Sequence, residues 1–205
     1  MTKNSILSLR PHPVEDDVVA FGCRQGLVYI VSLSGKGKQL QKIRAHDEDI
    51  QGIDWSPIDV HDLLNNDGDK FDLPLAVSCR DKSVTIWSSK TCKRLAILKL
   101  QKVKTESPWI TMKWLDSNRI FVSGAQGELC MWDFDRLPKK NAHESVIKSD
   151  GTGQEFKIIH MEHQKNLFNI ACYQNLIFTC GYDRSFVCYN VKSESIVFNT
   201  MTFGG

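Results

Sequence analysis

Four tight polar turns, each lying between two apolar runs, recur along the chain and constrain its fold more than any other feature. The repeated segments read GCRQGLVYIV from Gly22, SCRDKSVTIW from Ser78, GAQGELCMW from Gly124 and CGYDRSFVCY from Cys180. Equivalent turn positions hold Gln25, Asp81, Gln126 and Asp183, and six residues later stand Val31, Trp87, Trp132 and Tyr189. The turn positions are 56, 45 and 57 residues apart. The chain is therefore built from four copies of one unit.

The length of the repeat indicates the type of unit. A period of roughly 40 to 45 residues with four strands per copy is typical of WD-repeat β-propellers. The two longer intervals require insertions, which the sequence places at Ile58 to Pro74 and at Leu137 to Gln154. Both segments are rich in polar and turn-forming residues, so we expect surface loops.

Each copy supplies short apolar runs that predict the strands of a propeller blade. Innermost strands are expected at Ile6–Leu9, Ile50–Trp55, Ile110–Leu115 and Leu167–Cys172. Second strands are expected at Val18–Phe21, Leu75–Ser78, Ile120–Ser123 and Leu176–Thr179, and outer strands at Gln39–Arg44, Arg94–Leu100 and Ser195–Thr200. Ala45-His46 stands where WD repeats usually carry Gly-His before the innermost strand.

The predicted fold class is all-β, a WD-repeat β-propeller with one domain over residues 1–205. The blades are expected at about residues 3–46, 47–100, 107–150 and 154–202. A complete four-bladed propeller is one interpretation, because such propellers exist. Four blades of a larger propeller, with the usual seven blades, is the interpretation we prefer.

Composition bounds the class of protein. Apolar content is 41% and charged content 24%, which fits a folded globular chain without a membrane-spanning run or a signal peptide. The seven cysteines include no C-x-x-C pair, and Cys79, Cys130, Cys180 and Cys188 lie in or beside apolar strand runs. We therefore expect buried, reduced thiols and a cytoplasmic or nuclear location.

Charge is distributed unevenly, although the net charge is only +2. Residues 47–72 contain nine acids and one base, whereas residues 80–104 contain eight bases and one acid. One interpretation is an electropositive surface that binds an anion, and the other is two oppositely charged, solvated surfaces.

Motifs for catalysis do not occur in the sequence. It contains no G-x-S-x-G, no G-x-x-x-x-G-K-[ST], no H-E-x-x-H and no glycine-rich dinucleotide turn. His160 and His163 lie three residues apart in a β context, which does not favour a shared metal. We expect no enzymatic activity, no cofactor and no metal site. Four aspartates are expected to hold propeller turns by hydrogen bonds: Asp54, Asp81, Asp133 and Asp183.

Propeller geometry gathers one set of side chains at one end of the blades. Successive strands are antiparallel, so the turn after each second strand lies beside the start of the first strand. This end is predicted to carry Arg80, Lys82, Trp109, Lys165, Tyr182 and Arg184. Aromatic faces stack on bases and Arg or Lys neutralises phosphates, a combination that suits single-stranded nucleic acid. The alternative is that Trp109 packs under a loop and that the lysine and arginine side chains pair with the acidic residues of the turns.

Trp109 and Trp114 differ in their expected surroundings. They lie five residues apart, and residues i and i+5 of a regular strand point to opposite faces. Trp114 is the better core candidate. Trp109 follows Pro108 at the mouth of the strand and is expected to be exposed.

Several segments resemble a known family. RAHDEDIQGIDWSP, SCRDKSVTIWSSKTCKRLAILKL, SPWITMKWL, AQGELCMWDF and HQKNLFNIACYQ are similar to the Gemin five family. Its members are WD-repeat subunits of the SMN complex that recognise small nuclear RNAs. The likeness runs over nearly all 205 residues, and it is strongest from Leu75 to Tyr189.

The resemblance implies a function and specific site residues. The family has two fused N-terminal propellers that bind the Sm site and the 7-methylguanosine cap of pre-snRNAs, and this chain would be part of the first. The base- and cap-stacking tryptophan of the family falls on Trp109, and two RNA-contacting arginines fall on Lys165 and Arg184. Lysine keeps the charge at 165 but not the bidentate geometry of arginine.

Two classes of function remain open. The first is RNA recognition for snRNP assembly, with snRNA and the SMN complex proteins as partners, no membrane partner, and a cytoplasmic and nuclear location. The second is a protein-docking WD-repeat scaffold without RNA binding. The composition of the predicted surface and the match at Trp109 favour the first.

Overall fold

The computed structural model describes residues 4–34, 36–57, 73–99, 110–116, 118–124, 127–133 and 157–202. These residues form sixteen strands and one short 3-10 turn, η1 (Arg24–Gly26). The strands make four four-stranded antiparallel sheets, each built from consecutive strands. Within this part of the chain, no helix is long and apolar enough to cross a membrane.

The strands of the first two sheets follow in chain order. The first sheet contains β1 (Ile6–Pro11), β2 (Val18–Cys23), β3 (Leu27–Ser32) and β4 (Lys38–Arg44). The second contains β5 (Ile50–Trp55), β6 (Pro74–Cys79), β7 (Ser83–Ser88) and β8 (Arg94–Lys99).

The other two sheets repeat this order. The third contains β9 (Met112–Trp114), β10 (Arg119–Ser123), β11 (Leu129–Asp133) and β12 (Lys157–His160). The fourth contains β13 (Leu167–Tyr173), β14 (Leu176–Gly181), β15 (Ser185–Asn190) and β16 (Ser195–Met201).

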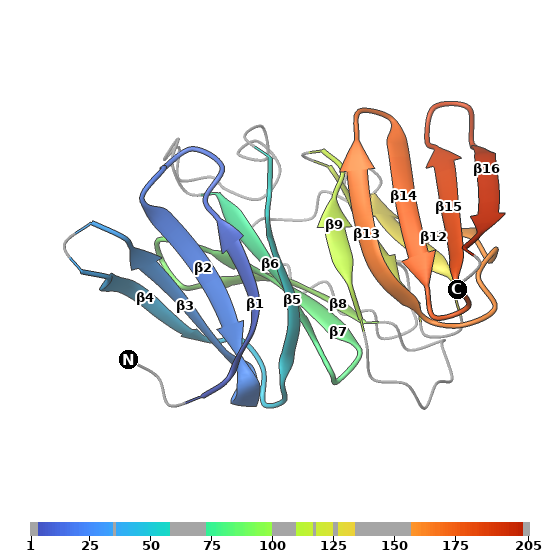
Figure 1. Ribbon diagram of the computed structural model, residues 1–205. Helices are drawn as coiled ribbons and strands as arrows, with labels where there is room; N and C mark the ends of the chain where they lie inside the picture. The colour runs from blue at the N-terminus through green and yellow to red at the C-terminus, as the bar shows by residue number, and fades with distance from the viewer. Residues whose placement is uncertain are drawn as a thin grey trace.

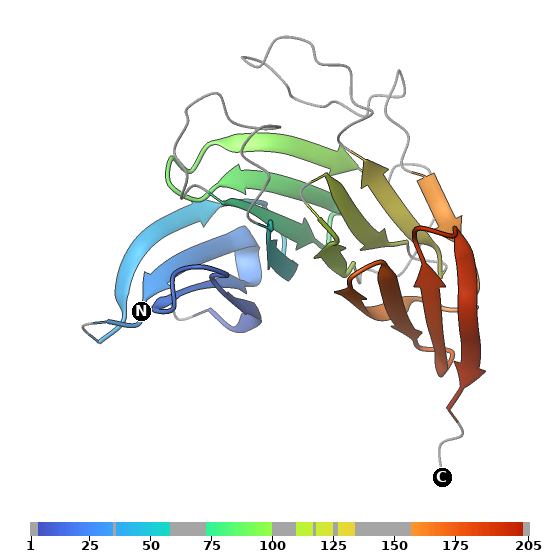
Figure 2. The ribbon, with the colours of Figure 1, turned by 90° about the horizontal axis from the view of Figure 1, so that it is seen from above.

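The four sheets follow one another around an arc, as Figure 2 shows from above. Neighbouring sheets meet through their first strands: β1 contacts β5, β5 contacts β9, and β9 contacts β13. These first strands all run upward in Figure 1. The arrangement is that of propeller blades and confirms the predicted fold class.

The register of the sheets confirms the predicted repeat. Each residue that ends a repeated segment lies on a third strand and pairs with the second-strand residue six positions before the turn centre. The four pairs are Val19 with Val31, Leu75 with Trp87, Ile120 with Trp132, and Ile177 with Tyr189.

Apolar side chains fill the three spaces between neighbouring sheets. The space between the second and third sheets holds Ile86, Leu98, Trp114 and Trp132, all at most 3% exposed. Trp114 is therefore a core residue, as predicted. Burying a large apolar side chain contributes about 1.5–3 kcal/mol, so each interface between sheets stabilises both of its partners.

Asp54 has a different role from the one its sequence predicts. Its carboxylate lies on the first strand of the second sheet, 2.7 Å from Lys113 Nζ and 3.6 Å from Arg10 Nε. The backbone N–H of Trp114 also donates to it over 3.0 Å. Asp54 holds no turn, because it bridges the innermost strands of three successive sheets.

The third sheet acquires its outer strand from a distant part of the chain. Leu129 of β11 pairs with His160 of β12, so Lys157–His160 belongs to this sheet although the repeat pattern includes it in the range 154–202. The predicted loop at Leu137 to Gln154 lies outside the described residues, as does the predicted loop before Leu73. Pro74, its last predicted residue, instead begins β6.

The cysteines are all free, as expected. Burial raises the pKa of Cys79 and of Cys130 to about 12, which keeps both thiols protonated. Cys180 was expected to be buried and is exposed. Its neighbour Thr179 is buried, so the alternation along β14 turns Cys180 to the opposite face of the fourth sheet, against which no described sheet packs.

Candidate nucleic-acid interface

The turns after the second strands lie beside the starts of the first strands, as predicted. The backbone N–H of Arg80 donates to the carbonyl of Asp49 over 3.1 Å, and that of Tyr182 to the carbonyl of Asn166 over 3.0 Å. We call this end of the sheets, toward the lower edge of Figure 1, the turn rim. It comprises the β2–β3, β6–β7 and β14–β15 turns and the starts of β1, β5 and β13.

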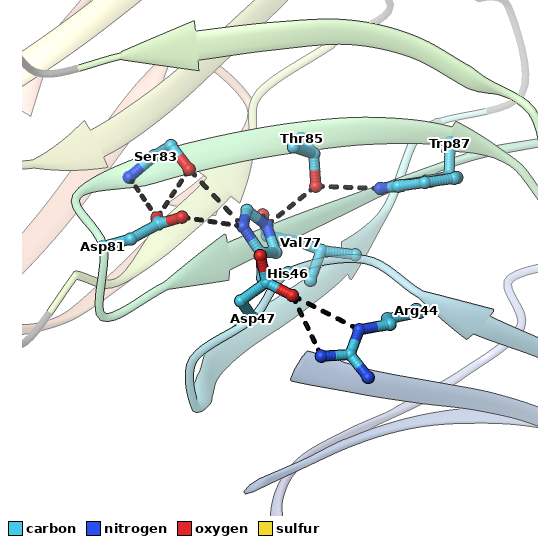
Figure 3. A network of polar contacts seen from close by, with 8 residues as sticks. All are labelled: Arg44, His46, Asp47, Val77, Asp81, Ser83, Thr85 and Trp87. Carbon is cyan, nitrogen blue, oxygen red and sulfur yellow. Dashed lines mark hydrogen bonds and ion pairs between the residues drawn. The ribbon is translucent and has the colours of Figure 1, made fainter. Parts of the chain in front are cut away.

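A buried polar network supports the turn rim at the second sheet (Figure 3). His46 Nδ1 lies 3.2 Å from Asp81 Oδ2, and its Nε2 lies 2.8 Å from Thr85 Oγ1. Trp87 Nε1 donates to the same Thr85 oxygen over 2.8 Å. The backbone N–H of Ser83 donates to Asp81 over 3.0 Å and so closes the turn.

The fourth sheet repeats this network with different residues. His163 Nδ1 lies 3.1 Å from Asp183 Oδ1, and its Nε2 lies 2.9 Å from Thr179 Oγ1. The backbone N–H groups of Gln164 and Ser185 donate to the same carboxylate over 2.7 Å and 3.0 Å. The network joins the segment before β13 to the β14–β15 turn.

These contacts keep the two turn acids ionised. Burial by itself would raise the pKa of Asp81, but hydrogen bonds from His46 and Ser83 outweigh it and lower the pKa to about 2. The same balance lowers the pKa of Asp183, where His163 is the main hydrogen-bond partner. Both carboxylates therefore serve the networks that hold the turns.

Three basic residues of the turn rim take no part in these networks. Arg80, Lys165 and Arg184 are exposed, and among the described residues no acid forms an ion pair with them. Lys82 is half-buried. The alternative, in which the basic side chains pair with the acidic residues of the turns, therefore does not hold for Arg80, Lys165 and Arg184.

Two of the basic residues have an unfavourable backbone conformation. Lys82 and Arg184 both have φ of 65°. They follow the turn centre directly, a position that glycine takes in the other sheets, with φ of 72° at Gly26 and 95° at Gly127. L-residues pay about 1–2 kcal/mol in this region, and such strain collects at functional sites.

The structure divides the predicted residues into two groups. Lys165, Tyr182 and Arg184 lie together at the fourth sheet, on the β14–β15 turn and the segment hydrogen-bonded to it. Arg80 and Lys82 lie at the second sheet, and the third sheet separates them from the first group.

The local charge differs between the two groups. At the second sheet the segment before β5 is acidic: Asp47, Glu48 and Asp49 precede the strand. At the fourth sheet the equivalent segment reads Gln164, Lys165 and Asn166. The β14–β15 turn therefore has the more positive surroundings.

Sequence reasoning missed one aromatic residue at this turn. Phe168 and Tyr182 lie with ring centroids 4.6 Å apart and interplanar angle 52°, and they are 48% and 55% exposed. Leu167 pairs with Gly181 and Asn169 with Cys180, so Phe168 is the extra residue of a β-bulge. Regular alternation along a strand does not predict this extra residue. The same bulge occurs at the start of β1 and β5.

Trp109 lies outside the described residues, and the bulge weakens the argument for its exposure. Ile50 and Trp55 are also five residues apart, yet they are 0% and 6% exposed and share one core cluster. The extra residue Gln51 shifts the parity of the strand. Leu167, which stands at the position of Ile50, is also 0% exposed.

Potential metal ligands are committed to other roles. Ligand atoms of His46, Cys79 and Asp81 lie within 4.8 Å of one another. However, both ring nitrogens of His46 already have partners, Asp81 and Thr85. His160 and His163 do not converge either: their ring centroids are 6.3 Å apart, and both nitrogens of His163 have partners.

Comparison with known proteins agrees with this geometry. Residues 37–88, which contain most of the second sheet and its polar network, match the family model "WD domain, G-beta repeat". This stretch contains a WD repeat, and the four sheets have the arrangement of propeller blades. The crystal structure of the computationally designed Ika4 protein has the same fold, with a TM-score of 0.62 at 13% identity over 93% of this chain and 94% of that one.

Two curated relatives are similar to almost the whole chain. Gem-associated protein 5 of Homo sapiens is 24% identical and that of Mus musculus 22% identical, each over 98% of this chain. The chain spans 15% of the length of these relatives. The resemblance inferred from the sequence is confirmed.

Proposed function

We propose that this protein is an RNA-binding WD-repeat module whose turn rim takes up single-stranded RNA. The observation that carries the proposal is the fourth blade. There Lys165 and Arg184 are exposed, have no acidic partner among the described residues, and share the turn region with the exposed aromatic residues Phe168 and Tyr182. Cations neutralise phosphates, and rings stack on bases that are not paired. Binding without catalysis agrees with the WD-repeat fold.

The similarity to Gem-associated protein 5 supports the proposal of one class of RNA as the target. We propose pre-snRNA as the target, with recognition of the Sm site and the 7-methylguanosine cap, and a role in snRNP assembly with the SMN complex proteins. The location would be cytoplasmic and nuclear. Trp109 remains in this proposal as a stacking residue on the strength of the resemblance.

Arg80 and Lys82 have a smaller part in the proposal. The turn that carries them lies beside the acidic segment before β5, which repels phosphate. We expect them to bind a distal part of the RNA. Neutralising them should lower affinity less than neutralising Lys165 and Arg184.

The test is fluorescence anisotropy of the intact protein with a labelled single-stranded Sm-site oligonucleotide. The same oligonucleotide in a duplex and one of scrambled sequence are the controls, and a cap analogue serves as competitor. We expect tightest binding to the single-stranded Sm site. Absence of binding to any of these RNAs would favour the alternative, a protein-docking WD-repeat scaffold.

A further inference from the structure

The rings of Phe168 and Tyr182 lie side by side at the turn rim, with their planes tilted by 52°. Their centroids are 4.6 Å apart, yet about half of each residue is exposed. Both residues therefore keep solvent-accessible area despite their mutual contact. Tyr182 Oη makes no hydrogen bond within the described residues, so the phenol is not held as a structural anchor.

The backbone holds both residues in place. Phe168 is the bulged residue at the start of β13, and Tyr182 is fixed by the hydrogen bond from its N–H to Asn166. Below them, the His163–Asp183 pair joins the same two segments. A Cβ at Gly181 would lie 2.6 Å from His163 Nδ1, so glycine is needed to make room for this pair. These contacts fix the positions of Phe168 and Tyr182 relative to each other.

Cationic residues flank the rings on both segments. Lys165 stands three residues before Phe168, and Arg184 stands two residues after Tyr182. Both are exposed and have no acidic partner among the described residues. An aromatic surface between two cations offers a face for a base and charges for the phosphates on either side of it.

We infer that Phe168 and Tyr182 form a stacking platform for one unpaired base of a bound RNA strand. The inference rests on the proposed function and adds Phe168 to the site. It also assigns Tyr182 a contact with a base rather than with a phosphate. The platform reads no base edge, so it accepts any unpaired base and rejects a duplex, whose bases are already stacked.

The test uses the variants Phe168→Leu and Tyr182→Leu, which keep apolar volume and remove a π-face. The probe is a single-stranded Sm-site oligonucleotide, labelled for anisotropy or carrying 2-aminopurine in place of one base. Each variant should weaken binding by about 5- to 140-fold, the equivalent of losing one base stack. The slope of log affinity against log salt should not change, because no charge is removed.

Two matched variants serve as controls. Tyr182→Phe keeps the ring and should bind as the wild type does. Phe198→Leu removes a ring that is 41% exposed in the middle of β16 of the same blade, and it should also bind normally. Thermal unfolding establishes that each variant is folded, and Tyr182→Leu carries the test if Phe168→Leu is not.

The outcomes separate the inference from the proposed function. A wild-type protein that binds no RNA overturns both. Wild-type binding with undiminished affinity in folded Phe168→Leu and Tyr182→Leu overturns the platform and leaves the proposed function in place. A loss in both variants, with 2-aminopurine quenched by the wild type and not by them, supports the platform.

Discussion

Arg184 and Gly127 occupy the same position in the turns of neighbouring blades, and both have positive φ, 65° and 95°. At Gly127 the reason is steric, because a Cβ would lie 2.1 Å from the carbonyl oxygen of His163. Arg184 adopts the same region with a long cationic side chain. Glycine would relieve backbone strain there, as it would at Gln25 and Lys82, which have φ of 62° and 65°.

Arg184→Gly should therefore separate stability from binding. Glycine relieves the left-handed strain but is more flexible in the unfolded chain, so we expect the free energy of unfolding to rise by about 0.5–1 kcal/mol. RNA affinity should fall. Urea denaturation and anisotropy measure the two quantities. A variant that is less stable and binds equally well would show that Arg184 is a structural residue.

Gly127→Ala should destabilise the junction between the third and fourth blades. The new Cβ collides with the backbone of His163, and the residue keeps an unfavourable φ. Gly37→Ala is a matched control, because φ there is 83° and nothing lies within 4 Å of the added atom. The control should cost about 1–2 kcal/mol. Gly127→Ala should cost clearly more by chemical denaturation, and equal costs would contradict the steric argument.

The repeat in the sequence predicts the blades because each hairpin is determined by residues that are close together in the sequence. One polar turn and two flanking apolar runs fix the register of a hairpin, so the position of Trp87 predicts that of Trp132. The same register predicts which residues reach the turn rim. Lys165, Tyr182 and Arg184 are found there, on one blade.

The remaining features depend on contacts that the sequence does not display. A bulge inserts one residue without any signal in the composition, so alternation along the strand does not predict that Phe168 is exposed. For the same reason, the spacing of five residues between Trp109 and Trp114 does not predict that they point to opposite faces. The outer strand of the third blade pairs across a long insertion, so its place could not be counted from the turn. Asp183 bonds His163, and Lys165 has no acidic partner in the part of the chain that the structure describes; both facts depend on tertiary geometry alone.

Trp114→Ala should destabilise the protein strongly. The indole is 3% exposed in the cluster between the second and third blades, and large-to-small changes at such sites cost about 3–5 kcal/mol. Trp109→Ala is the comparison: as a stacking residue it should fold and bind RNA more weakly by about 1–3 kcal/mol. Loss of folding in Trp109→Ala would instead place this indole in the core, like Ile50.

His160 should make stability depend on pH between about 6.5 and 4. Burial, with a further effect of nearby His163 and opposition from Glu162, lowers the pKa of His160 from 6.5 to about 4. Among the described residues, neither ring nitrogen has a hydrogen-bond partner. The unfolded state binds a proton first as the pH falls, so the folded state loses stability through this window, by about 3 kcal/mol in total.

His160→Leu tests this dependence by removing the titrating group. Denaturation at pH 7, 5.5 and 4 should show a smaller loss of stability on acidification than in the wild type. Lys157→Gln is a control on the same strand, where an exposed ion pair with Glu194 contributes little. Parallel pH profiles for His160→Leu and the wild type would show that His160 does not titrate in this range.

The salt dependence of RNA binding tests the central claim most directly. Affinity for the single-stranded Sm-site oligonucleotide is measured at several salt concentrations for the wild type, Lys165→Gln, Arg184→Gln and Lys192→Gln. Lys192 is an exposed lysine of the same blade at the end opposite the turn rim. The account predicts that Lys165→Gln and Arg184→Gln each flatten the slope by about 0.7 and that Lys192→Gln leaves it unchanged. Identical slopes in all four proteins would contradict an RNA site at this rim.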